Sequence, residues 1–121
     1  MTVRIGMPSE EREAVARKEL VKVANAMLDG TFHLLEGARK INGLRFRIND
    51  PENKIFNLFV AVDSETDHQP LGPMRALCAL EFLRRADEEM EHYLADTRDS
   101  ILRACRELIQ AYSEPISDPT E

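Results

Sequence analysis

The second half of the chain carries an apolar pattern long enough to dictate a helical fold. We expect one helix that begins between Pro73 and Ala79 and ends near Ser113, ahead of Pro115. Asp87 is the one charged residue in its apolar face. A helix of more than 30 residues is about 50 Å long, whereas a compact domain of this size is roughly 35 Å across. The face recurs at three- and four-residue steps, at Leu80, Leu83, Met90, Leu94, Thr97, Ile101, Ala104, Leu108 and Ala111.

A second long helix is predicted in the first half of the chain, from about Glu10 to Lys40. Gly30 and Gly37 interrupt it, each at a cost of about 1 kcal/mol relative to alanine in a helix interior. Gly30 is a point at which this helix can kink or split, and Asn42-Gly43 is its predicted end. Its mostly apolar face consists of Leu20, Ala24, Met27, Thr31, Leu34, Leu35, Ala38 and Ile41.

A shorter helix is predicted over residues 51–62. Asp50 suits the N-cap, Pro51 suits the first helical position and Glu52 suits the first turn, although the sequence IFNLFVAV is also typical of a buried strand. Apolar residues on nearly all sides predict that this helix is the most enclosed element. Residues 44–49, which precede it, are compatible with a helical continuation or with an extended link.

These elements predict an all-α fold in one domain spanning 1–121: two long helices packed antiparallel, the shorter helix buried between them, and an ordered polar loop at one end. Residues 1–8 and 115–121 are expected to be a flexible leader and tail. The overhanging part of the last helix has no obvious cover within the chain. We therefore expect a homodimer with Leu94, Ile101 or Leu108 near the contact. A kink at Gly30 that folds the first helix back over this face is the alternative.

Charge and cysteine content narrow the partners and the compartment. The net charge of −6 argues against nucleic-acid binding, which needs clustered Lys and Arg. The longest apolar run, 58–62, is too short to span a bilayer, so we expect no membrane partner. If Cys78 and Cys105 lie on one helix, they are roughly 40 Å apart and cannot form a disulfide. Reduced thiols indicate a cytoplasmic protein.

The most polar segment is FVAVDSETDHQPLGPMR, residues 59–75. Its alternating oxygen-bearing side chains resemble the start of a calcium loop, but the sixth position is His68 where glycine is required, and the twelfth is Met74 where a glutamate is required. We favour a structural turn in which Asp, Ser and Thr side chains bond backbone amides. We expect the loop over 63–75 to be ordered, since two prolines restrict it.

Several polar side chains form a candidate binding or structural cluster with this loop. Glu36 and Arg39 lie at i,i+3, and they can pair with each other or reach across to the loop. Glu89 and His92 place a carboxylate and an imidazole on one helical face, as di-iron bundles do, but only one such pair is present. We expect no metal, no cofactor and no catalytic residue. The cluster consists of Glu36, Arg39, Asp63, Glu65, Asp67, His68 and Arg75.

The segments LLEGARKINGLRF and FVAVDSETDHQPLGPMR, followed by a long charged helix ending in RACRELI, resemble a group of small uncharacterised bacterial proteins. The resemblance extends from Leu34 to Ile109 and implies a bacterial, cytosolic, helical protein without a known activity.

Small size, acidic charge and the lack of a catalytic set favour a non-catalytic protein-interaction module, of the inhibitor, immunity or regulatory type, with a basic protein as partner. The alternative is a metal- or small-molecule-binding enzyme. It would use the acidic loop, with these residues: Asp63, Glu65, Asp67, His68 and either Glu36 or His92.

Overall fold

The computed structural model describes residues 9–113, and helices are the only regular secondary structure in this part of the chain, which confirms the all-α prediction. The predicted leader and tail, 1–8 and 115–121, lie outside the described residues. No helix within residues 9–113 is both long enough and apolar enough to cross a membrane. The elements in chain order are α1 (Ser9–Asp29), α2 (Leu34–Arg47), the 3-10 helix η1 (Lys54–Phe56), α3 (Asn57–Glu65), the 3-10 helix η2 (Gly72–Leu77) and α4 (Leu80–Tyr112).

The predicted first long helix is in fact two helices, α1 and α2, because the chain breaks at Gly30. Gly30 has a φ of 85°, in the left-handed region that glycine adopts without steric cost. The Thr31 amide then donates to the Ala26 carbonyl (3.0 Å), which closes the end of α1. A new helix starts with His33 as its N-cap, whose Nδ1 accepts a hydrogen bond from the Leu35 amide (3.1 Å).

The predicted end of this helix at Asn42-Gly43 is wrong, since α2 continues to Arg47. Leu44 and Ile48 are both buried in the core, so the apolar face extends past the glycine and burial outweighs its poor helix propensity. The chain turns at Asn49, which has a φ of 63°, a conformation that asparagine tolerates better than most residues.

The third helix begins later than predicted. Asp50 does not cap an α-helix; its carboxylate instead accepts hydrogen bonds from the Tyr112 hydroxyl (2.6 Å) and the Asn53 amide group (2.9 Å). Asn53 caps η1, because its side-chain oxygen accepts from the Ile55 amide (3.0 Å). Helix α3 follows directly and ends at Glu65, so the first three residues of the predicted polar loop are helical.

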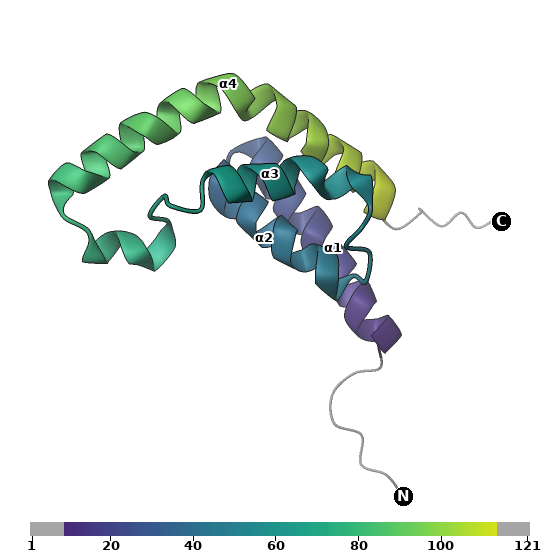
Figure 1. Cartoon of the computed structure of the whole chain (residues 1–121). Helices are drawn as coiled ribbons and strands as arrows, with labels where there is room; N and C mark the ends of the chain where they lie inside the picture. Colours follow the sequence, from purple (N-terminus) through teal and green to yellow (C-terminus); the bar gives the residue numbers. More distant parts are fainter. Residues whose placement is uncertain (1–8, 114–121) are drawn as a thin grey trace, which may run out of the picture.

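The prediction that this helix is the most enclosed element is also wrong. Only Phe59 and Val62 of α3 are buried, while Ala61 and Ser64 are exposed. The helix lies against the outside of α2 and touches α4 only at its edge (Figure 1). Helix α1 has a more enclosed face, on which Ala16, Leu20 and Ala24 have no exposed surface.

Helix α1 packs antiparallel along the second half of α4 (Figure 1). Near the end of α1, the Met27 sulfur lies 3.8 Å from Cys105 Sγ. Ile101 and Leu108 have no exposed surface and Leu94 is partly buried against the core, so α1 covers the face that was predicted to form a dimer contact. The predicted location of that contact at Ile101 and Leu108 is therefore wrong.

The first half of α4 extends beyond the core formed by α1, α2 and α3 (Figure 1). Helix η2 folds back beneath it, and the chain reverses direction between Leu77 and Leu80. We call this projecting part, residues 72–90, the arm. The overhang expected from the length of α4 is therefore present. Helix η2 lies along this part of α4 and forms the second side of the arm.

Candidate functional site

The junction between core and arm contains most of the predicted polar cluster. Arg39 on α2 donates from Nε to Asp63 Oδ1 (3.0 Å) and from a terminal nitrogen to the Thr66 carbonyl (3.0 Å). Asn42 donates to the second oxygen of Asp63 (2.8 Å). A cation beside the last carbonyls of a helix is favourable, so Arg39 fixes the C-terminal end of α3 against α2. Both carboxylate oxygens of Asp63 are used in this structural role.

Glu65 points to a different element. Its carboxylate accepts a hydrogen bond of 2.7 Å from the Tyr93 hydroxyl on α4. Burial of the ring and this hydrogen bond to a carboxylate both raise the pKa of Tyr93. Glu65 therefore links α3 to the middle of α4 and does not join Arg39.

Arg75 on η2 pairs with Asp87 on α4 in two parallel hydrogen bonds of 2.9 and 3.0 Å. The pair raises the pKa of Arg75 and lowers that of Asp87. Glu36 is close enough to add to the rise in the Arg75 pKa through its charge, without a hydrogen bond. Sequence reasoning missed Asp87 as the partner, although its position as the one charge in an apolar face was the available signal.

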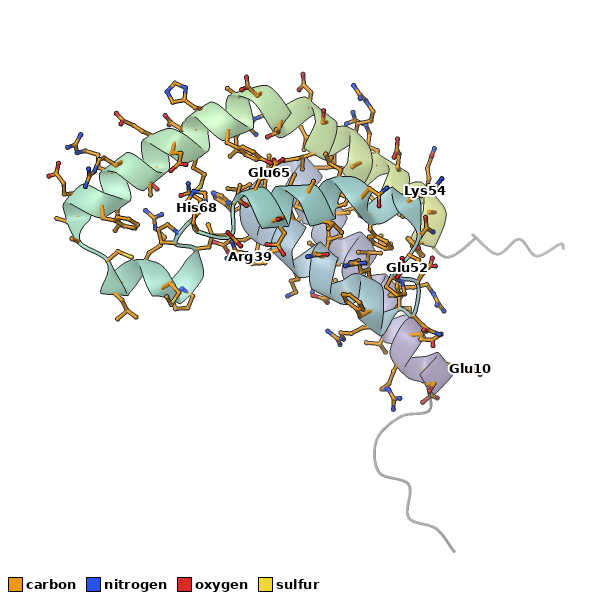
Figure 2. All side chains as sticks on the ribbon, in the orientation of Figure 1. Glu10, Arg39, Glu52, Lys54, Glu65 and His68 are labelled. Carbon is orange, nitrogen blue, oxygen red and sulfur yellow. The ribbon has the colours of Figure 1, made fainter. Side chains whose placement is uncertain are left out.

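His68 and Glu89 form a third link between the loop and α4, with 3.1 Å between His68 Nε2 and Glu89 Oε2. Figure 2 shows His68 between the end of α3 and the arm, with Arg39 and Glu65 on the core side. Asp67 is exposed and makes no hydrogen bond or ion pair with any described residue. His92 is likewise exposed and does not join Glu89.

The predicted cluster thus separates into independent links, one of which ties the loop segment to α2 and three of which tie it to α4. Within residues 9–113, no group of three His, Cys, Asp or Glu side chains is arranged to hold a metal ion. The geometry supports the structural interpretation of the loop, whose polar side chains hold the arm in a fixed position on the core. The links are Arg39–Asp63, Glu65–Tyr93, His68–Glu89 and Arg75–Asp87.

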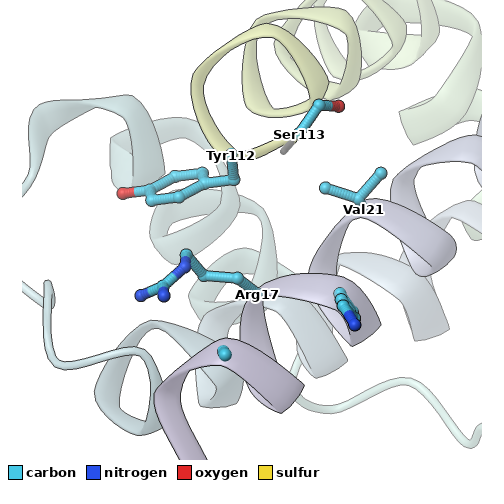
Figure 3. A pocket seen from close by; sticks show the side chains of 6 residues that line it. Arg17, Val21, Tyr112 and Ser113 are labelled. Carbon is cyan, nitrogen blue, oxygen red and sulfur yellow. The ribbon is translucent and has the colours of Figure 1, made fainter. Parts of the chain in front are cut away.

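A separate hollow of about 220 Å³ lies between α1 and the end of α4 (Figure 3). Arg17 lies beside the Tyr112 ring, and Val21 provides an aliphatic wall. The Tyr112 hydroxyl is already bound to Asp50 at 2.6 Å, and burial together with this bond raises its pKa. The Tyr112 phenol is therefore neutral, and its hydroxyl is already used within the chain.

The feature that sequence reasoning missed is a set of exposed apolar side chains at the end of the arm. Met74, Leu77 and Leu80 are 59%, 81% and 84% exposed. Met74 and Leu77 are three residues apart on a 3-10 helix, a spacing that places both on the same side. Leu80 belongs to the apolar face predicted for α4 and lies in its overhanging part, which α1 does not reach (Figure 1). We call these three residues the arm tip.

Comparison of the chain with protein-family models, curated proteins and solved structures found no match. The resemblance to small bacterial helical proteins therefore stays a prediction, and function is argued from the geometry alone.

Proposed function

We propose that this protein is a non-catalytic protein-interaction module that binds its partner through the arm tip. The observation that supports this most directly is the exposure of Leu77 and Leu80, at 81% and 84%. Burying a leucine side chain contributes about 1.5–3 kcal/mol, and large side chains exposed together are typical of interaction sites. Three such residues together therefore form a surface that is buried only when a partner binds.

The links at the junction support this proposal because they hold the tip in place. Arg75–Asp87 joins the two sides of the arm, His68–Glu89 joins the arm to the loop, and Glu65–Tyr93 joins α3 to α4 just beyond the arm. A surface that is ordered before binding loses less conformational entropy in the complex. The polar residues of the loop then serve binding indirectly, by presenting the tip.

The charge beyond the tip favours a basic partner. Along α4, Arg84 and Arg85 follow the arm tip, and beyond them residues 88–99 carry five exposed carboxylates and one arginine, Arg98. An acidic flank on the same helix as an apolar tip attracts proteins that carry a basic rim around an apolar groove and accelerates their association. This supports an inhibitor, immunity or regulatory type of interaction. The acidic residues are Glu88, Glu89, Glu91, Asp96 and Asp99.

The homodimer stays a prediction, now with the tip as its contact. Two tips can meet without strong repulsion, because Glu81 pairs with Arg84 and Asp87 pairs with Arg75 in each chain. The acidic flanks of two copies would repel each other, however, so a basic partner fits the whole surface better. We also propose a cytoplasmic location, which the two unpaired thiols of Cys78 and Cys105 support.

Cys78 provides a direct test, because it lies between Leu77 and Leu80 at the end of the arm. Cys105 is buried, and burial raises the pKa of its thiol to about 12, so a maleimide reagent will label Cys78 selectively. We expect a photo-reactive group on Cys78 to cross-link a basic protein in native lysate. A product of two 13.8 kDa chains would instead identify a second copy. The absence of any stoichiometric cross-link would contradict the proposal.

A further inference from the structure

A hollow of about 320 Å³ lies between the loop and α4, and none of the three arm-tip residues lines it. Its volume lies at the small end of the range for ligand sites. Its walls carry a positively charged side chain, a negatively charged side chain and an aromatic ring. The lining residues are His68, Gln69, Phe82, Arg85, Ala86 and Glu89.

Arg85 brings a free positive charge to this hollow. Two carboxylates on α4 lie one helical turn away, at Glu81 and Glu89, a spacing that normally allows an ion pair. Both are bound elsewhere, because Glu81 accepts from Arg84 (2.6 Å) and Glu89 contacts His68 (3.1 Å). Arg85 consequently makes no ion pair or hydrogen bond with any described residue, and its guanidinium is available for an anion.

Gln69 brings a buried amide that the chain does not satisfy. Its side chain is 95% buried by residue exposure, and its Oε1 has no hydrogen-bond partner within residues 9–113. Its Nε2 lies 3.3 Å from His68 Nε2. That histidine nitrogen cannot accept from Gln69 while it donates to Glu89. Turning the amide over lets Oε1 accept from His68, but it leaves the NH₂ group unpaired in place of the oxygen. In either orientation one buried polar group lacks a partner, which is a destabilising arrangement.

We propose that this hollow binds a free α-amino acid. Its carboxylate would pair with Arg85. Its ammonium group would donate to the Glu89 carboxylate, beside the Gln69 amide that also lines the hollow. Phe82 and Ala86 provide an apolar wall for the side chain. A zwitterion satisfies both charges of this surface at once, whereas a simple anion would meet the Glu89 carboxylate.

The test uses the full chain and the proteinogenic amino acids as probes, with binding measured by calorimetry and by the shift in Tm. We expect at least one amino acid with an apolar side chain to bind. Its N-acetyl derivative lacks the ammonium and its amide lacks the carboxylate, and each should bind at least about tenfold more weakly. If no amino acid binds at concentrations up to about 10 mM, the proposal is overturned.

Matched variants separate this site from the rest of the molecule. Arg85→Gln should abolish binding without changing the Tm of the free protein, and Arg98→Gln, which alters an exposed arginine of α4 outside the hollow, should bind normally. Gln69→Leu removes the unpaired amide, so it should raise the Tm of the free protein and still weaken binding. Equal binding by wild type and Arg85→Gln would contradict the proposal. Leu77→Glu/Leu80→Glu should still bind the amino acid, because neither leucine lines the hollow. If the wild type binds no amino acid, the arm-tip proposal is unaffected.

Discussion

The Arg75 guanidinium and the Asp87 carboxylate form two parallel hydrogen bonds, of 2.9 and 3.0 Å, across the arm. The pair joins η2 to α4, although the two residues lie only twelve positions apart in the chain. Paired fork-to-fork bonds fix orientation as well as distance. The presentation of Met74 and Leu77, both on η2, therefore depends on this pair.

We expect Arg75→Met to loosen η2 without unfolding the core. Amide exchange over residues 72–80 should accelerate by about tenfold or more, because local opening of η2 no longer has to break the Arg75–Asp87 ion pair. Exchange in α1 and α2 should stay unchanged. Arg84→Gln removes a surface pair with Glu81 on the same arm, and it should leave exchange of η2 as in the wild type. Uniformly slow exchange in the Arg75→Met variant would show that other contacts hold η2.

Gly37 and Gly43 offer a matched pair of glycines within α2. A Cβ at Gly37 would lie 2.3 Å from the Met27 sulfur, and Met27 is itself buried against Cys105. Gly37→Ala should therefore destabilise the protein by about 1–3 kcal/mol, as overpacking does. A Cβ at Gly43 meets nothing within 4 Å, so Gly43→Ala should stabilise by about 0.5–1 kcal/mol. Chemical denaturation measures both, and equal effects of the two changes would refute the close approach of α1 and α2.

Arg39 should contribute measurably to stability through Asp63 and the Thr66 carbonyl. We expect Arg39→Met to cost roughly 1 kcal/mol, a value reduced for the partial exposure of both side chains. The first exchange to accelerate should be that of the last turn of α3. Arg47→Met is the control, because Arg47 is exposed at the end of the same helix. If both variants unfold at the same denaturant concentration as the wild type, Arg39 does not hold α3.

The Asp50–Tyr112 pair predicts a loss of stability in alkali. Burial and the bond to Asp50 raise the pKa of Tyr112 in the folded state, whereas in the unfolded chain it titrates near its ordinary value of about 10. The contribution of the neutral Tyr112 hydroxyl to the free energy of unfolding is therefore complete below about pH 10 and is lost as the pH rises further. Tyr112→Phe should unfold more easily at pH 7 but lose less Tm between about pH 9 and 11. Parallel Tm curves for the two proteins would argue against this linkage.

The helical class and the last helix could be predicted because they depend on local pattern. The predicted end of α4 at Ser113 is within one residue of the observed end at Tyr112. The break at Gly30 was foreseen as one alternative, since glycine adopts the left-handed conformation without steric cost. The end of α2 was wrong because burial of Leu44 and Ile48 is a tertiary effect that outweighs the local stop signal at Asn42-Gly43.

The candidate site was harder to predict for the same reason. A contact of Arg39 with the loop was one of the alternatives left open by the sequence, beside an ion pair with Glu36, and the structure shows the contact with Asp63. The partner of Arg75 depends on how η2 folds back along α4, which no local pattern specifies. Leu80 continues the apolar spacing of α4, but it is exposed because α1 ends before reaching it. Periodicity indicates which residues share a face and does not indicate where the covering helix stops.

The most direct test of the interaction proposal is the binding of the Cys78-cross-linked partner, once purified, to tip variants of this protein. Leu77→Glu/Leu80→Glu places charge in the contact, and we expect it to weaken binding by at least about tenfold, since burial of each leucine contributes about 1.5–3 kcal/mol. Phe46→Glu changes an apolar residue that is 60% exposed on α2, and it should bind like the wild type. If the tip variant binds as tightly as the wild type, the arm tip is not the binding surface.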